Sequence, residues 1–171
     1  MFEEVILLGA PDRSIALETR RGRPIRNVQT PEPGKRERAR YELIRKKYGS
    51  AWSHRKPACG FYNCFGMVFA SRRTSILEEE MVERVLTDDG YRLLVGEEPV
   101  PGDLVLYRDG LTGGLLHAAM ILRCERMGNA SIPFALSKWN DSAGEDMHHV
   151  QHHCWRDFDL KLEYWTDRPQ P

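Results

Sequence analysis

The sequence predicts a single soluble domain of the α+β class with an antiparallel sheet. The predicted helices come first along the chain and the predicted strands follow them, an order that is typical of α+β folds. The 171 residues are enough for one domain with a sizeable core. The composition, 41% hydrophobic and 29% charged, is that of a soluble globular protein.

The first 56 residues are interpreted as a basic N-terminal extension that packs on a core formed by residues 57–171. The extension carries 14 Lys and Arg against 7 Asp and Glu, and the core carries 11 against 18, so the two parts are expected to attract each other. The apolar run 4–8 is a predicted strand, and residues 15–17 are a second, brief one. An irregular arm rich in Arg, Pro and Gly leads on to residue 34.

The first helix is predicted over residues 35–48. Tyr41, Ile44 and Tyr48 recur on one helical face, and Gly49 follows as a stop signal. The remaining, mostly basic residues are expected to form a solvated face, because no DNA-reading motif or aromatic platform accompanies them. Nucleic acid is therefore not the favoured partner.

The segment 57–71 is mostly apolar, in contrast to the basic residues before it. Gly60 and Asn63 suit a turn, and a compact apolar segment begins at Cys64. This segment is compatible with either a strand or a buried helix.

A further helix is predicted downstream of Ser75. Ser75 and Glu78 fit a capping box, and the turn 88–90 ends the helix. Its apolar face consists of Met81, Val82, Val85 and Leu86.

Residues 91–95 are expected to begin extended structure. From residue 99 onward the pattern is that of strands. The predicted strands that follow cover residues 104–107, 116–124, 134–139 and 158–164.

The chain is expected to be cytoplasmic, with reduced thiols. Its first ten residues lack the basic start and long apolar run of a secretory signal. Nothing approaches the roughly 18 consecutive apolar residues of a membrane helix. The four cysteines include no CxxC pair that would suggest a zinc or redox site. No membrane partner and no cofactor are therefore expected, and the oligomeric state is left open.

Cys64 is the candidate nucleophile and His117 the candidate base. If Cys64 opens a helix, the positive end of the helix dipole lowers the pKa of its thiol, and its backbone N–H can serve an oxyanion hole. Gly66 would leave room for a substrate or a strand. His117 begins an apolar strand and is followed by the small residues Ala118 and Ala119, so it can face a helix N-terminus as a general base.

Three segments resemble the NlpC/P60 and CHAP group of papain-like cysteine peptidases and amidases. They read NCFGMVF from Asn63, PGDLVLY from Pro101 and LHAAMIL from Leu116. In that group the first segment carries the nucleophile at a helix start, the second is a strand, and the third is a strand with the histidine at its beginning. The resemblance covers about residues 57–140. It implies a papain-like (NlpC/P60-like) domain whose nucleophile-bearing helix packs on an antiparallel sheet.

Carried over by position, the resemblance implies that Cys64 and His117 form the catalytic pair of a thiol hydrolase. Such an enzyme acts on a peptide, protein or small amide through an acyl-enzyme. In that group a polar residue on the next strand orients the imidazole; Ser137 and Asn140 are candidates here, and Ser137 is chosen. Residues expected to line the site are Asn63, Gly66, Trp139 and Asn140, with Trp139 in the core or in a cleft wall.

Four histidines precede Cys154. They are His148, His149, His152 and His153. Their spacing is compatible with zinc ligands, but no second ligand pair stands at a defined distance, and Glu145 does not form an HExxH arrangement with them. A solvated or cleft-lining loop is therefore favoured, and no metal is assigned.

Two other functions remain open. Phe65 stands where the NlpC/P60 and CHAP group has serine or a small residue, so a catalytically degenerate binding module on the same fold is one alternative. The other is a binder of nucleic acid or an acidic partner through the basic residues 35–56.

Overall fold

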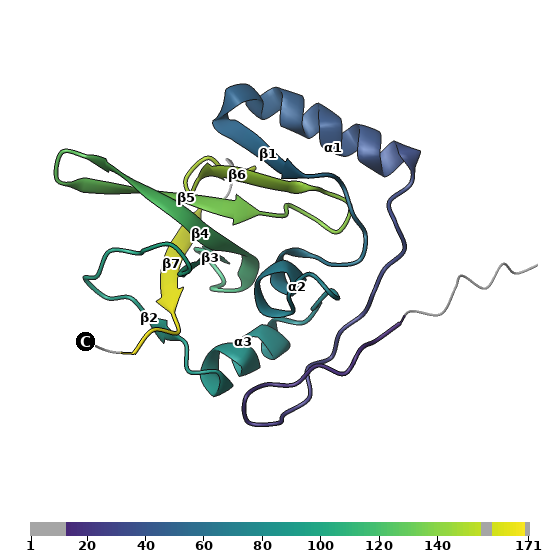
Figure 1. Cartoon of the computed structure of the whole chain (residues 1–171), viewed down its shortest axis with the longest axis horizontal. Coiled ribbons are helices and arrows are strands. Elements are labelled where there is room, and N and C mark those ends of the chain that lie inside the picture. Colours follow the sequence, from purple (N-terminus) through teal and green to yellow (C-terminus); the bar gives the residue numbers. More distant parts are fainter. Residues whose placement is uncertain (1–12, 155–158, 170–171) are drawn as a thin grey trace, which may run out of the picture.

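The structure is a computed structural model that describes residues 13–154 and 159–169. It contains one seven-stranded sheet in the order β1-β6-β5-β4-β3-β7-β2, and every neighbouring pair is antiparallel (Figure 1). This architecture confirms the α+β class. No helix in the described part of the chain is both long and apolar enough to cross a membrane.

The elements have the following bounds. The helices are α1 (Lys35–Tyr48), α2 (Cys64–Phe69) and α3 (Glu79–Asp88), and a 3-10 turn covers Gly49–Ala51. The strands are β1 (Trp52–Lys56), β2 (Arg92–Leu93), β3 (Leu104–Asp109), β4 (Leu115–Met127), β5 (Ala130–Ser137), β6 (Glu145–His149) and β7 (Leu160–Thr166). The predicted strand 4–8 and residue 158 lie outside the described residues.

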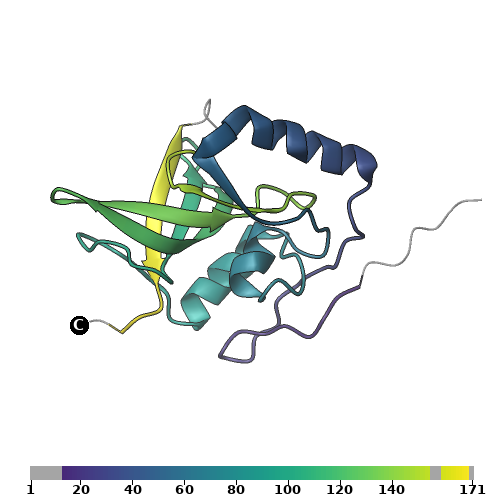
Figure 2. The same ribbon diagram turned by 45° about the horizontal axis from the view of Figure 1, so that its top comes forward.

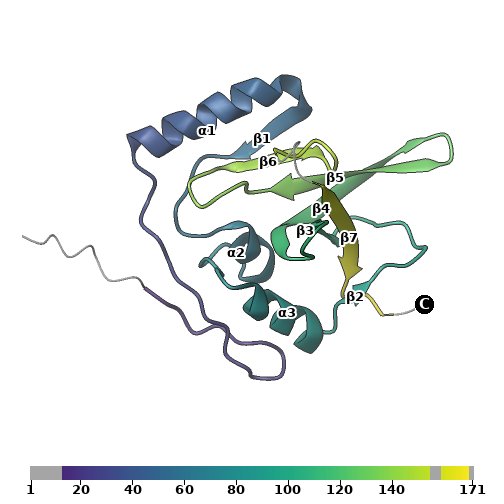
Figure 3. The same cartoon turned by 180° about the vertical axis from the view of Figure 1, so that it is seen from behind.

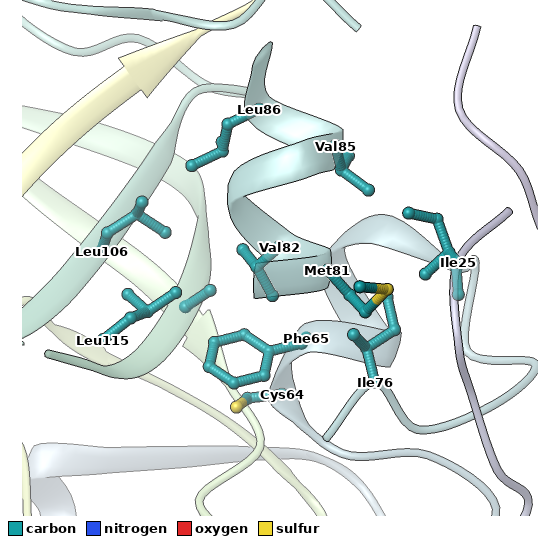
Figure 4. Packing of buried hydrophobic residues seen from close by; sticks show 12 residues of the cluster. Ile25, Cys64, Phe65, Ile76, Met81, Val82, Val85, Leu86, Leu106 and Leu115 are labelled. Atoms are coloured by element: carbon teal, nitrogen blue, oxygen red, sulfur yellow. The ribbon is translucent and has the colours of Figure 1, made fainter. Parts of the chain in front are cut away.

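The two faces of the sheet bury separate cores. On one face, Leu106 and Ala118 pack against α2 and α3 (Figure 4). On the opposite face, Tyr107 and Ala119 belong to a second cluster. Because Tyr107 pairs with His117 and Leu106 with Ala118, strand alternation directs His117 away from α2 and α3.

α1 has its predicted bounds and its predicted buried face. Tyr41 and Tyr48 are buried, and Tyr48 stacks on Trp52 with ring centroids 4.1 Å apart. Trp52 begins β1, which sequence analysis places in the N-terminal extension but which forms an edge strand of the sheet (Figures 1 and 2). The extension therefore contributes to the same sheet as the candidate site.

The N-terminal arm runs along α2 and α3 (Figure 3). Its residues 15–17 do not form a strand, a correction to the prediction: the arm folds back on itself, and Ile25 donates a backbone hydrogen bond to Leu17. Ile25 is buried in the core cluster of α3. Farther along the arm, Val28 and Ser75 exchange two backbone hydrogen bonds.

The predicted capping box before α3 is wrong. The helix begins at Glu79 with Glu78 in the N-cap position, and no side chain caps it. Ser75 instead uses its backbone to bind the N-terminal arm, so it lies in an extended segment. The apolar face predicted for this helix is confirmed, because Met81, Val82, Val85 and Leu86 are all buried.

Candidate active site

Cys64 is the first residue of α2, and Asn63 caps this helix. The side-chain oxygen of Asn63 accepts hydrogen bonds from the Gly66 amide at 2.9 Å and the Ile76 amide at 3.2 Å. Its side-chain nitrogen donates to the Ile76 carbonyl at 2.6 Å. The segment that opens at Cys64 is therefore a helix. Asn63 was expected to line the site. It is buried and caps the start of this helix.

Gly66 makes room for the loop after α2. A Cβ atom on Gly66 would lie 1.7 Å from the carbonyl oxygen of Thr74. The loop reaches this position through Ser71 and Arg72, whose φ angles of 50° and 64° are left-handed. The close approach is thus to backbone of the same chain, which corrects the expectation of a substrate or a strand at this glycine.

The same loop ties α2 to β6. The Arg72 guanidinium pairs with Glu145, which also accepts a hydrogen bond from the Tyr62 hydroxyl at 2.8 Å. Burial would raise the pKa of Glu145, but the hydrogen bonds from Arg72 and Tyr62 keep that pKa below its ordinary value. A partly buried ion pair therefore links the loop after α2 to a strand far away in sequence.

Cys64 lies beside the backbone that follows His117. The amide of Ile121 donates to the carbonyl of Asp103, directly before β3, so in an antiparallel ladder the amide of Ala118 points to the β5 side of β4. β5 ends at Ser137, and there the Ala118 amide interacts with the Cys64 thiol and favours its ionised form. Cys64 and His117 thus reach the same end of β4, one beside its backbone and the other on the face away from α2.

Burial dominates the ionisation of the Cys64 thiol. Burial raises its pKa to about 11, although the amides of Ala118 and Phe65 act in the opposite direction. The charge of Asp141 raises that pKa further. The hydrogen bonds of the described residues do not include a direct one between Cys64 and His117. The site therefore holds a thiol, not a thiolate–imidazolium pair.

His117 and Ser137 meet on the face away from α2. Nε2 of His117 lies 2.9 Å from Oγ of Ser137, and both residues are buried. The indole of Trp139 stacks on the imidazole of His117. Asn140, the other candidate for the orienting residue, is exposed and accepts a hydrogen bond from the Ser142 amide instead.

A second histidine shares the hydroxyl of Ser137. Nε2 of His148 lies 2.7 Å from Oγ of Ser137, and Nδ1 of His148 lies 2.7 Å from the carbonyl oxygen of His149. The His148 ring also packs against Trp139 with centroids 4.5 Å apart. The expectation that this histidine belongs to a solvated or cleft-lining loop is wrong, because His148 is 1% exposed and lies in β6.

Both imidazoles are neutral. Burial lowers the pKa of His117 well below its ordinary value, and the nearby His148 and His153 act in the same direction. Burial also lowers the pKa of His148 to about 3, against the effect of its backbone hydrogen bond. A neutral imidazole carries one protonated and one basic nitrogen, so His117 is able to accept a proton.

Lys138 anchors the loop that follows β5. Its ammonium donates hydrogen bonds to the carbonyls of Cys59 at 2.6 Å and Asp141 at 3.1 Å, and to that of Ala143. Burial lowers the pKa of Lys138 to about 8. β5 covers Ala130–Ser137, so the predicted strand 134–139 begins four residues too late and continues two residues too far.

Two cavities flank this loop. The larger, of about 360 Å³, lies between the loop and α1; the other, of about 300 Å³, adjoins the arm at residues 30–34. Asn140 lines the first cavity, and Asp141 lines both. Cys64 itself is buried and lines neither cavity.

The histidine cluster does not form a metal site within the described part of the chain. No group of three or more His, Cys, Asp or Glu side chains is arranged there to hold a metal ion. His148 is bound to Ser137, and His149 and His152 pack against each other with ring centroids 5.2 Å apart.

The arrangement combines groups that nucleophilic attack on a carbonyl requires. It has a thiol at a helix start, an imidazole with a hydrogen-bonded orienting residue, and a backbone amide beside the sulfur. The thiol must lose its burial before it can react as a thiolate. No protein-family model matches the chain, and no curated protein and no solved structure gives a significant match to it.

Proposed function

We propose that this protein is a thiol hydrolase, a peptidase or amidase, on a papain-like fold of the NlpC/P60 kind. The observation that supports this most directly is the hydrogen bond between Ser137 and His117. The resemblance selects Ser137 as the residue that orients the base, and that residue does contact the imidazole. The substrate is an amide of a peptide, a protein or a small molecule.

The reaction begins when the proton of the Cys64 thiol moves to His117. The thiolate then attacks the amide carbonyl, and His117 returns the proton to the leaving amine. Water hydrolyses the thioester that remains, which regenerates the thiol and releases a carboxylic acid. The Ala118, Phe65 and Cys64 amides interact with the sulfur and are the candidates to stabilise the oxyanion.

The described conformation is the resting state of this enzyme. Burial is the largest cause of the raised pKa of Cys64, so water that reaches the thiol removes that cause. Residues 140–142 of the loop 138–143 line the first cavity, and the loop is held by the hydrogen bonds of Lys138. A substrate that displaces this loop exposes the thiol at the moment when the carbonyl arrives.

The pH dependence of thiol alkylation tests the proposal. Iodoacetamide labelling of each cysteine is followed by mass spectrometry from pH 5 to 10 in Lys138→Ala, which removes the hydrogen bonds that hold the loop 138–143, and in the double variant Lys138→Ala/His117→Ala. Cys154 is an internal control, because burial raises its pKa to about 11 as well and no catalytic role is assigned to it. In the wild type, burial keeps the pKa of Cys64 at about 11. With the loop released in Lys138→Ala, we expect Cys64 to react with an apparent pKa well below the free-thiol value of about 8.5, and the added His117→Ala to abolish this difference.

The same experiment distinguishes the hydrolase from a second candidate, a catalytically inactive binding module on this fold. The burial of Cys64 and its raised pKa favour that alternative. If Cys64 titrates like Cys154 in both proteins, the hydrolase proposal is refuted and the binding module is retained. If Cys64 is reactive, a Cys64→Ser variant provides the inactive control for screening amide substrates.

A further inference from the structure

Ser137 stands between two histidines, and the three side chains form a continuous chain of hydrogen bonds. It runs from Nε2 of His117 through Oγ of Ser137 to Nε2 of His148, with distances of 2.9 Å and 2.7 Å. Nδ1 of His148 continues it to the carbonyl oxygen of His149 at 2.7 Å. All three side chains are at most 1% exposed, so water does not compete for these contacts.

The carbonyl of His149 determines which atoms donate and which accept in this series of hydrogen bonds. A carbonyl oxygen only accepts hydrogen bonds, so Nδ1 of His148 must carry the proton that it donates to His149. A second proton on His148 would create a buried cation. Burial opposes that cation, and so do the neighbouring rings of His149, His152 and His153. His148 is thus neutral, and its Nε2 is a hydrogen-bond acceptor.

The Ser137 hydroxyl in turn determines which nitrogen of His117 carries the proton. A hydroxyl has one hydrogen, and the acceptor Nε2 of His148 takes it. Toward His117 the Ser137 oxygen is then only an acceptor, so Nε2 of His117 must carry a proton. Because burial also keeps His117 neutral, its Nδ1 is the unprotonated nitrogen.

We propose that His148 is a positioning residue, which fixes the Ser137 hydroxyl and thereby holds His117 in the tautomer with a proton on Nε2 and a basic Nδ1. The catalytic consequence rests on the proposed function, in which Nδ1 takes the proton of Cys64. The hydrogen bond from Nε2 to Ser137 is the same in neutral and protonated His117. His117 can therefore gain and lose a proton at Nδ1 while the Ser137 hydroxyl keeps its orientation.

Aromatic side chains pack against the two imidazoles that bind Ser137. Trp139 contacts both imidazoles, with ring centroids 5.2 Å from His117 and 4.5 Å from His148. Trp52 lies on the other side of this group, 4.7 Å from Trp139 and 6.4 Å from His148. The two imidazoles are therefore held by contact with an indole as well as by hydrogen bonds.

The test is the tautomer of each histidine in the resting protein. Long-range ¹H–¹⁵N correlation spectra distinguish a protonated from an unprotonated imidazole nitrogen, and neither substrate nor activity is needed. In the wild type we expect His117 protonated at Nε2 and His148 protonated at Nδ1. The opposite tautomer in either ring overturns the proposal, whether or not any variant folds.

Two variants of His148 sharpen this test. His148→Phe keeps an aromatic ring but removes the acceptor, so the Ser137 hydroxyl can turn to His117, and we expect loss of the pure Nε2-protonated tautomer. His148→Gln offers a carbonyl oxygen as acceptor, and we expect the wild-type tautomer to persist. An unchanged His117 spectrum in a folded His148→Phe protein overturns the positioning role. A correct tautomer together with a Cys64 that stays unreactive in Lys138→Ala overturns the hydrolase alone.

Discussion

The indole of Trp139 stacks on the imidazole of His117, with ring centroids 5.2 Å apart and planes 15° from parallel. Trp139 follows Ser137 by two residues, so one short segment supplies both the hydrogen bond to the base and the wall behind it. Trp139 is 7% exposed and also stacks on Trp52. This relationship makes the site part of the core, and the first prediction follows from it.

Trp139→Ala is expected to lower the free energy of unfolding by about 3–5 kcal/mol, the usual cost of deleting a buried large aromatic side chain. Trp139→Phe retains a stacked ring and is expected to cost less. Urea unfolding followed by circular dichroism measures both. Leu111→Ala is the control, because Leu111 is 90% exposed and its loss should change stability by no more than about 0.5 kcal/mol.

Gly66→Ala is expected to prevent normal folding of the site. The added Cβ would meet the Thr74 backbone oxygen at 1.7 Å, and backbone cannot yield as a flexible side chain can. The matched control is Gly114→Ala, whose nearest neighbour is the Thr112 hydroxyl at 3.3 Å. Thermal melting of both variants separates the cases, and a Gly66→Ala protein that melts like the control would contradict this account of α2.

The two asparagines that flank the site are expected to differ in stability effect. Asn63→Ala removes a helix cap and two further hydrogen bonds to Ile76 in a buried position, so we expect a loss of about 2–4 kcal/mol. Asn140→Ala removes one bond to the Ser142 amide in an exposed loop and should cost below about 1 kcal/mol. Equal losses in denaturant unfolding would show that the Asn63 contacts are not as described.

Stability is expected to fall as the pH is lowered through the range from 6.5 to about 3. In this range an unfolded histidine, with an ordinary pKa of 6.5, binds a proton, whereas folded His148, with a pKa of about 3, does not. The unfolded state therefore binds more protons, and the free energy of unfolding decreases with decreasing pH. The lowered pKa of His117 acts in the same direction.

Urea midpoints at pH 7.5 and pH 5 measure this dependence, and His148→Gln is the informative variant. It removes one titrating group, so we expect a smaller difference between the two midpoints than in the wild type. An equal or larger difference would mean that His148 is protonated in the folded protein. That result would also conflict with the direction assigned to the hydrogen bonds of Ser137.

Much of the fold was predictable because its signals are local. The face formed by Tyr41, Ile44 and Tyr48 predicts α1 with its observed bounds. The apolar runs at 104–107 and 116–124 predict the two strands that carry the centre of the sheet. In these segments the period of the side chains reflects burial on one or two faces, which the sequence records directly.

The two strands that complete the site were not predictable in this way. β1 is exposed from Ser53 onward, as suits a polar strand at the edge of a sheet. β6 reads EDMHH and gives no apolar alternation, because Glu145, Asp146 and His148 are buried with partners from distant elements. Burial of polar groups is decided by their tertiary partners, which pattern alone does not reveal.

The ionisation of the site also departs from the expectation. The helix dipole at the start of α2 was expected to lower the pKa of the Cys64 thiol, yet burial raises it to about 11. Desolvation outweighs the dipole of a helix of six residues. The sequence suggests which residues meet at the site, but how much water reaches them depends on the loop held by Lys138.

The pairing of β3 with β7 has a consequence for the synthesis of the chain. β4 follows β3 directly and can pair with it as soon as it leaves the ribosome, and β5 then pairs with β4. The other edge of β3 must wait for residues 160–166. Until then the nascent chain presents an apolar strand, Leu104 to Tyr107, with an unpaired edge. A chain that stops short of β7 would therefore be prone to aggregate, and the appearance of residues 160–166 sets the time at which this sheet can be completed.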